Sequence, residues 1–142
     1  MNNKCVGITA EYNPFHNGHL YHLEQSKLAT GAQISVAAMS GNFVQRGHMA
    51  ICSKWERAEA AVKCGIDLVV EIPTVFACNS APVFASAAVE ILENLGADWI
   101  SFGSESGNIE ELKEISRAMN EKEPLIEKLV REKVKEGLSY PR

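Results

Sequence analysis

Residues 5–20 read Cys-Val-Gly-Ile-Thr-Ala-Glu-Tyr-Asn-Pro-Phe-His-Asn-Gly-His-Leu and set the architecture of the chain. The first six of these residues are apolar and β-rich, which predicts a buried strand. Asn13-Pro14 and Asn17-Gly18 indicate a turn-rich loop directly after it. Apolar residues then recur at helical spacing from Leu20 onward, and Gly31 is a typical residue at which such a helix ends. The chain therefore opens with one strand–loop–helix unit.

The alternation of strand and helix continues outward from this unit. Three further strands are predicted at residues 34–39, 67–72 and 99–102. Two intervening helices are predicted at residues 53–65 and 82–96. Ser53 is a plausible N-cap of the first of these helices, and Pro82 is well placed to open the second. Four such alternations predict an α/β fold, with a parallel sheet that is covered by helices on both faces.

The last part of the chain has a different pattern. Two amphipathic helices are predicted there, one with apolar positions from Ile109 to Met119 and one from Pro124 to Gly137. We interpret residues 108–142 as helices that continue the domain formed by residues 1–107. Residues 137–142 resemble a loop that leads onward, so we interpret the chain as truncated after residue 142.

Composition places the chain among ordinary globular proteins. It has 142 residues, 46% of them hydrophobic and 23% charged, with a net charge of −4. No basic excess indicates a nucleic-acid groove. No apolar run reaches the roughly 18–20 residues that a membrane-spanning helix needs. We therefore expect a cytoplasmic protein without a membrane partner.

The metal-binding residue types are not spaced as in a zinc site. The four cysteines, Cys5, Cys52, Cys64 and Cys78, form no C-x-x-C pair, and we expect them to be buried, reduced thiols. His16, His19 and His48 could together ligate a metal, but no cysteine or carboxylate lies at matching spacing. We predict no metal site in the protein itself.

The chemistry is expected where the first strand meets the first helix. In open α/β sheets, ligands bind beyond the carboxyl ends of the strands, and the first backbone N–H groups of a helix attract anions. His16 and His19 lie three residues apart at that helix start, so both imidazoles can point at one triphosphate and either can be protonated there. Gly18 allows close approach of an adenine or ribose. His22 extends the same face by one turn.

Several blocks of the chain, in order, are similar to the bacterial tRNA(Met) cytidine acetate ligase family of HIGH-type nucleotidyltransferases. The His-x-Gly-His pattern after a first strand is the superfamily signature. The closer resemblance rests on residues 10–20, 39–47, 53–55, 67–73 and 102–105. It spans essentially the whole chain, and it implies a Rossmann-like nucleotidyltransferase fold whose ATP-binding domain is residues 1–107.

The resemblance implies an activity and a set of site residues. Such enzymes use ATP, with Mg²⁺, and acetate to form acetyl-adenylate, then acetylate the wobble cytidine of elongator tRNA(Met). His16 and His19 would be the catalytic pair. The ATP-binding segment maps to Thr9, Ala10, Glu11, Tyr12, Asn13, Pro14, Phe15, His16, Asn17, Gly18, His19, Leu20 and His22, with a further contact at Gly103. The other ATP-contacting residues of the family would lie beyond residue 142.

Other residues at the same edge have open roles. Acetate, phosphate or RNA contacts are predicted for Ser40, Asn42, Gln45, Arg46 and Lys54. Glu11 could anchor the site or a magnesium-bound water, and Trp55 and Trp99 are expected in the core. Two alternative functions remain: an adenylyltransferase that acts on a small phosphorylated acceptor, and a non-catalytic nucleotide- or RNA-binding module. The sequence indicates no oligomeric state.

Overall fold

The structure, a computed structural model, describes residues 3–137. The chain divides into two compact units, unit 1 (Met1–Gly103) and unit 2 (Ser104–Arg142). This division lies close to the boundary predicted after residue 107. That the last helices continue the domain of unit 1 stays a prediction.

Unit 1 is built on a four-stranded sheet. Its strands are β1 (Cys5–Ala10), β2 (Ile34–Ser40), β3 (Leu68–Ile72) and β4 (Trp99–Ser101), in the order β3-β2-β1-β4. Every neighbouring pair is parallel, and Ala10 lies beside Met39, which in turn lies beside Glu71. The predicted parallel sheet is confirmed. All four strands end at one edge, so the loops that follow them can meet there.

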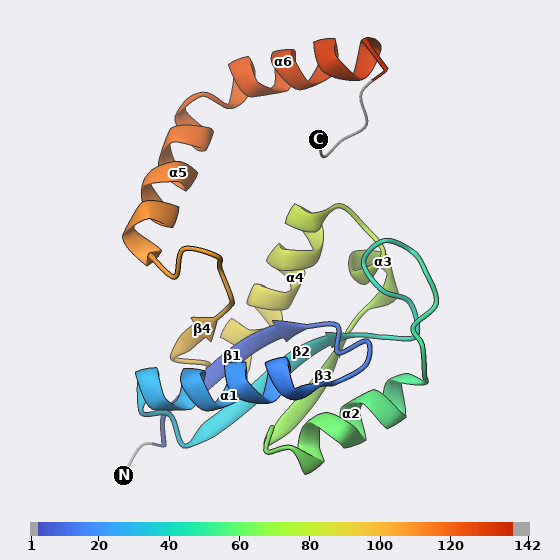
Figure 1. The fold of residues 1–142 in the computed structure, drawn as a ribbon, viewed down its shortest axis with the longest axis vertical. Helices are drawn as coiled ribbons and strands as arrows, with labels where there is room; N and C mark the ends of the chain where they lie inside the picture. The colour runs from blue at the N-terminus through green and yellow to red at the C-terminus, as the bar shows by residue number, and fades with distance from the viewer. Residues whose placement is uncertain (1–2, 138–142) are drawn as a thin grey trace. The chain divides into compact units, whose positions relative to one another are not determined.

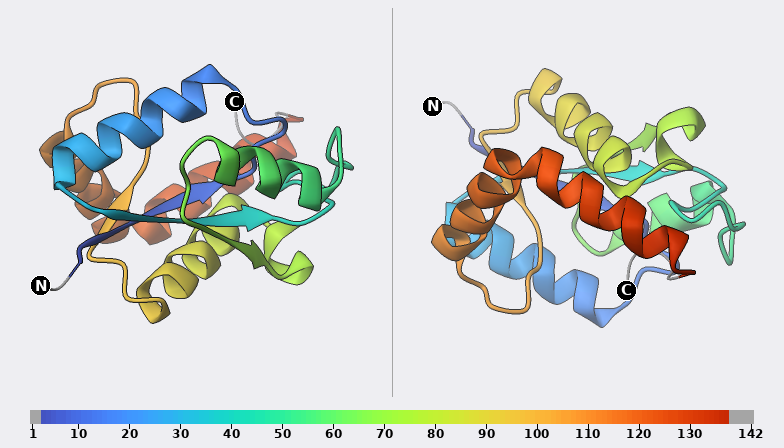
Figure 2. Two further views of the ribbon diagram at one scale, coloured as in Figure 1. Left: turned by 90° about the horizontal axis from the view of Figure 1, so that it is seen from below. Right: turned by 90° about the horizontal axis from the view of Figure 1, so that it is seen from above.

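Helices cover both faces of this sheet, as predicted (Figures 1 and 2). On one face, α1 (Asn17–Thr30) and α2 (Lys54–Lys63) pack through Leu23 and Ala61 onto Ile8 and Met39. On the other face, α3 (Thr74–Ala77) and α4 (Ala81–Asn94) form the second core cluster with alternate residues of the strands. Helix α3 was not predicted, because four residues are too few to show a helical period.

Three helix-to-strand connections of unit 1 share one local design. Each has a glycine with positive φ, then an apolar residue, then a polar acceptor, and the three glycines are Gly31, Gly65 and Gly96. The acceptor side chain takes a hydrogen bond from the backbone N–H of a neighbouring chain segment. Asp98 accepts from Cys5 N at 2.7 Å, and Asp67 accepts from Ser35 N at 2.8 Å. These contacts tie the amino-terminal edge of the sheet together.

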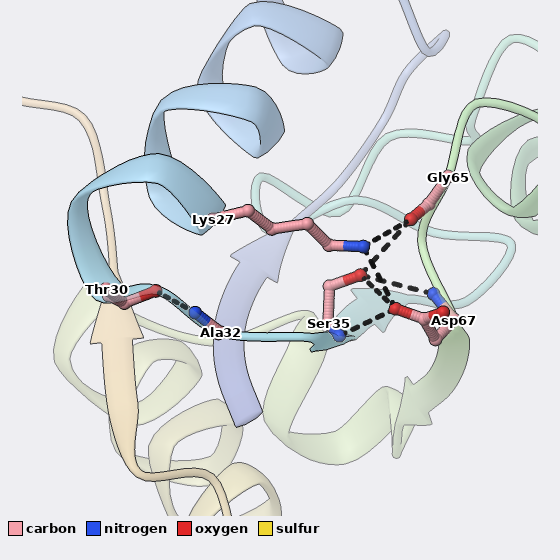
Figure 3. A network of polar contacts seen from close by, with 6 residues as sticks. All are labelled: Lys27, Thr30, Ala32, Ser35, Gly65 and Asp67. Carbon is pink, nitrogen blue, oxygen red and sulfur yellow. Dashed lines mark hydrogen bonds and ion pairs between the residues drawn. The ribbon is translucent and has the colours of Figure 1, made fainter. Parts of the chain in front are cut away.

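Figure 3 shows the most connected of these contacts. Asp67 accepts hydrogen bonds from Ser35 Oγ at 2.8 Å and from Lys27 Nζ at 3.1 Å, and Lys27 also donates to the Gly65 carbonyl. Burial raises the pKa of Asp67, but the hydrogen bonds from Ser35 and Lys27 outweigh this and hold it below its ordinary value. One carboxylate thus joins α1, β2 and the start of β3.

Unit 2 contains two amphipathic helices, α5 (Ile109–Glu121) and α6 (Glu123–Lys135). Asn108 caps α5 by accepting from the backbone of Glu110 and Glu111. Neither helix has a buried residue, and large apolar side chains such as Ile115 and Leu129 are about half exposed. In residues 3–137, no helix is long and apolar enough to cross a membrane.

Several side chains depart from the burial that the sequence predicted. Trp55 is 74% exposed rather than in the core, because it lies on the outer side of the first turn of α2. Leu28 is 77% exposed although it follows the helical spacing of Leu20 and Leu23. All four cysteines are free, but only Cys5 is buried as expected. Cys52 and Cys78 are partly exposed, and Cys64 is exposed at the end of α2. Trp99 is half-buried beneath Lys4.

Candidate functional site

A cavity of about 460 Å³ lies where β1 runs into α1. It is formed by residues of unit 1 alone. Apart from Ile8, every residue that lines it belongs to the predicted ATP-binding set: Thr9, Ala10, Glu11, Tyr12, Asn13, Pro14, His16, His19 and His22. The fold therefore brings most of the predicted site residues to one hollow at the carboxyl edge of the sheet. Their contact with a nucleotide stays a prediction.

His16 and His19 together cap the start of α1. His16 Nδ1 accepts the backbone N–H of Gly18 at 3.1 Å, and His19 Nδ1 accepts the backbone N–H of His16 at 3.2 Å. Ser or Thr paired with Glu or Gln usually fills these positions of a capping box. A ring nitrogen that accepts an N–H carries no proton, so in each neutral ring the proton lies on Nε2. The cap thus leaves two Nε2–H donors available to a ligand.

The two rings are packed against each other and against the aromatic residues before them. His16 and His19 stack at a centroid distance of 3.7 Å, and His19 also meets Tyr12 edge-on at 4.9 Å. Tyr12 is buried and packs against Phe15, which is turned toward the core. Tyr12 has a φ of 46°, a left-handed conformation that is uncommon for an aromatic residue. Packing therefore holds the imidazoles in place.

Gly18 is required by the histidine cap itself. A Cβ atom at this position would lie 2.9 Å from Cε1 and 3.1 Å from Nδ1 of His16. The sequence suggested that this glycine makes room for a nucleotide. The structure adds a second reason, because any side chain here would push the His16 ring away from the backbone N–H that it accepts.

His22 is held by a second set of polar contacts. Its Nε2 lies 3.0 Å from Ser101 Oγ at the end of β4, and Ser101 Oγ lies 2.6 Å from Ser26 Oγ. Ser26 in turn donates to the His22 carbonyl at 2.6 Å. Neither serine was predicted to belong to the site. His22 and Ser26 lie four residues apart on one helix, and no local sequence pattern relates them to Ser101. The contacts fix the His22 ring at the wall of the cavity.

Two of the histidines at the cavity have a pKa below the ordinary value. Burial lowers the pKa of His19, and the neighbouring His16 and His22 rings lower it further. Burial also lowers the pKa of His22. The sequence suggested that either His16 or His19 could be protonated. In the cap geometry, a proton on Nδ1 would displace a backbone hydrogen bond. Protonation of either ring beside a phosphate stays a prediction.

The loop after β2, residues 41–53, is attached to the cavity loop at two points. The Glu11 carboxylate accepts the backbone N–H of Gln45, and Asn13 Oδ1 accepts the backbone N–H of Ile51 at 2.7 Å. Glu11 therefore anchors the site, one of the two roles suggested for it. The loop is also folded on itself by a bridge between Phe43 and Met49.

The residues predicted to contact acetate, phosphate or RNA have different surroundings. Ser40 is the last residue of β2 and is fully buried, and its contact with acetate, phosphate or RNA stays a prediction. The Asn42 side chain accepts the backbone N–H of Lys54, and Lys54 Nζ lies 2.5 Å from Glu71. Gln45 and the exposed Arg46 lie in the loop after β2. For these four residues, ligand contact stays a prediction.

Some predicted residues lie outside the cavity lining. Asn17 and Gly18 form the first turn of α1, Leu20 is half-buried behind it, and Phe15 packs toward the core. Gly103, the last residue of unit 1, is exposed, with nothing near the position of a Cβ atom. Among the described residues, no group of three or more His, Cys, Asp or Glu side chains is arranged to hold a metal ion.

Comparison with known proteins identifies relatives of this arrangement. A family model described as HIGH Nucleotidyl Transferase matches residues 3–142. The tRNA(Met) cytidine acetate ligase of Caldicellulosiruptor saccharolyticus is 51% identical over 139 residues, which are 98% of this chain and 35% of that protein. The protein of the same name from Bacillus subtilis is 45% identical over 138 residues, which are 97% of this chain and 33% of that protein. The chain thus spans about a third of the length of these curated relatives.

A solved structure shows the same fold. Thermotoga maritima TmcAL bound with alpha-thio ATP matches with a TM-score of 0.85 and 44% identity, over 97% of this chain and 34% of that chain. This likeness confirms the predicted Rossmann-like nucleotidyltransferase fold. Together with the match over residues 3–142, it leads to one assignment: the chain belongs to the HIGH nucleotidyl transferase family.

Proposed function

We propose that this chain is the ATP-binding part of an enzyme that activates acetate and acetylates the wobble cytidine of elongator tRNA(Met). The observation that carries the ATP site is the histidine cap, because it leaves two Nε2–H donors available beside a cavity of about 460 Å³ at a helix start. The names of the relatives support acetate and tRNA as the substrates. The ATP analogue bound to the Thermotoga maritima protein supports the nucleotide.

In this proposal the triphosphate lies against the start of α1. The helix N-terminus and the Nε2–H groups of His16 and His19 face the negative charge of the phosphates. An acetate carboxylate oxygen attacks the α-phosphorus, and the bond to the pyrophosphate oxygen breaks, which leaves acetyl-adenylate. The N4 amine of the cytidine then attacks the acyl carbon and AMP departs. The two donors stabilise charge on the leaving pyrophosphate, so catalysis rests on positioning and electrostatics.

Magnesium would arrive with the nucleotide. Mg²⁺ is commonly held by substrate phosphates and water together with one or two carboxylates. The nearest carboxylate in the cavity wall is Glu11, and its Oε1 atom already accepts the Gln45 N–H. Its other oxygen is the group that could face a magnesium-bound water. The protein would therefore contribute little to the direct coordination of the metal.

The test is MgATP binding by calorimetry. A His16→Ala, His19→Ala double variant removes two donors to charged oxygens, each worth about 1.5–3 kcal/mol, so its dissociation constant should rise on the order of 100-fold or more. His48→Ala is the matched control, since His48 is exposed in the loop after β2 and outside the cavity. Equal affinity of the double variant and the native chain would refute the site. ATP–pyrophosphate exchange that responds to phosphopantetheine and not to acetate would refute the substrate.

A further inference from the structure

Arg57 is a buried arginine at the edge of the sheet where the cavity lies. It belongs to the first turns of α2, and only 1% of its surface is exposed. Its guanidinium donates to the backbone carbonyls of Glu11, Ser40 and Gly41. Ser40 is the last residue of β2, and Glu11 and Gly41 directly follow the ends of β1 and β2. One side chain therefore binds the carboxyl ends of two neighbouring strands.

This is an expensive arrangement if stability alone is considered. No carboxylate of the described residues forms an ion pair with Arg57, and its Nε atom and the nearby Ser40 Oγ have no hydrogen-bond partner there. Burial lowers the pKa of Arg57, and the charges of Glu11 and Glu71 offset this only in part. An apolar side chain of similar volume is often at least as stabilising as a buried ionic group. The useful property of arginine at this position is its planar, forked guanidinium group (the fork), which can donate hydrogen bonds to several carbonyls at fixed angles.

Glu11, whose carbonyl accepts from Arg57 directly after β1, is part of the cavity wall. Its carboxylate also accepts the Gln45 N–H from the second loop. Asn13, two residues later in the same wall, accepts the Ile51 N–H. The position of the Glu11 backbone therefore sets both contacts between the two loops, and it sets where the chain turns toward His16.

We infer that Arg57 is a positioning residue of the nucleotide site, whose guanidinium fixes the strand ends and thereby the two loops that form the cavity. Arg57 itself is not among the residues that line the cavity. Loss of the fork should loosen Glu11 and displace the loop that delivers the histidines. This inference rests on the proposed ATP site for its affinity readout, but its structural readout does not.

The first experiment compares MgATP affinity in three variants of the chain. Arg57→Met removes the fork and the charge, Arg57→Lys keeps the charge without the fork, and Ala61→Gly loosens the same helix through the core at a fully buried position. We expect Arg57→Met to raise the dissociation constant about tenfold, Arg57→Lys to lie between it and the native chain, and Ala61→Gly to bind within about twofold of native. Native affinity in Arg57→Met, or an equal loss in Ala61→Gly, would overturn the inference.

The second experiment needs no nucleotide. Hydrogen exchange at the Gln45 and Ile51 amides should become at least about tenfold faster in Arg57→Met, while the Cys64 amide, bonded to Ala60 within α2, keeps its protection. Unchanged exchange at the two loop amides would overturn the inference even if the native chain binds no ATP. If Arg57→Met does not fold, the same comparison between Arg57→Lys and Ala61→Gly decides.

Discussion

His16 and His19 each use one ring nitrogen for the helix and leave the other for a ligand. The Nδ1 atoms accept backbone N–H groups and thereby hold both rings in the same tautomer. Stacking of the rings at 3.7 Å restricts their rotation as well. A donor that is already oriented loses little entropy when phosphate binds, which is the physical advantage of a cap made from histidines.

Gly18→Ala separates the cap from the stability of the helix. Alanine is more favourable than glycine inside a helix by about 0.5–1 kcal/mol, so the free energy of unfolding should stay level or rise slightly. The new Cβ would lie 2.9 Å from the His16 ring and displace it, so MgATP affinity should fall roughly fivefold to tenfold. Urea denaturation and calorimetry measure the two effects. A variant that binds ATP as well as the native chain would contradict this account of the glycine.

The histidines also make stability depend on pH. The pKa values of His19 and His22 lie below the ordinary 6.5 in the folded chain, so the unfolded chain takes up protons first as the pH falls. The free energy of unfolding should therefore decrease from pH 7.5 to pH 5.5. Asp67 adds nothing in this range, because its pKa lies below 3.8. Urea denaturation of a His19→Gln, His22→Gln variant should show a flatter pH dependence, and an equally steep one would contradict the assignment.

Among the elements, the helix-to-strand connections show how a short pattern fixes an edge of the sheet. The sequence contains Gly-Ile-Asp at 65–67 and Gly-Ala-Asp at 96–98, and both aspartates accept a backbone N–H of a neighbouring segment. Glycine supplies the positive φ that ends the helix, and the carboxylate satisfies a donor at the start of the adjacent strand. These contacts lie at the opposite edge from the cavity.

Asp67→Ala should therefore weaken the fold and spare the site. It removes the acceptor of three hydrogen bonds, from Ser35 N, Ser35 Oγ and Lys27 Nζ. Because the Asp67 side chain is 47% exposed, solvent screening reduces the loss to about 1–2 kcal/mol in the free energy of unfolding. Asp67→Asn, which keeps one acceptor, should lose less. A change in MgATP affinity beyond about twofold would show that the two edges are coupled.

At the scale of the whole molecule, the cavity lies entirely in unit 1. Every residue that lines it precedes Gly103, and the polar contacts that hold His22 end at Ser101. In the described part of unit 2, α5 and α6 have no buried residue. The histidine cap and the anchoring contacts of the second loop are formed by residues of unit 1.

A chain that ends at Gly103 should accordingly fold and keep its nucleotide affinity. We expect cooperative urea denaturation of residues 1–103 and a dissociation constant for MgATP within about threefold of the native chain. Removal of the half-exposed apolar side chains of α5 and α6 should also reduce self-association, which sedimentation can measure. A truncated chain that folds but binds ATP at least tenfold more weakly would show that unit 2 contributes to the site.

Local sequence patterns were sufficient to predict the parallel sheet and the order of its strands and helices along the chain. Hydrophobic periodicity and the positions of glycine and proline are local properties, so they predicted β1 to β4 and the Ser53 cap without knowledge of the fold. Helix α1 begins at Asn17, two residues inside the stretch that was expected to be a loop. The histidine pattern, read with the block resemblance, pointed to the family. Helix α3 was not predictable in this way, because four residues are too few to show a helical period. The exposure of Trp55 and Leu28 was not predictable either, because the elements that pack against a helix decide which of its sides is covered.

The contacts that hold the cavity loops in place became visible only in the folded chain. Arg57 has the spacing of an ordinary exposed helix residue, and nothing local indicates that it donates to the ends of two strands. The joining of Glu11 to Gln45 and of His22 to Ser101 likewise connects residues that are 34 and 79 positions apart. Such contacts follow from the parallel arrangement of the strands, which brings distant loops to one edge, and a local sequence pattern does not contain them.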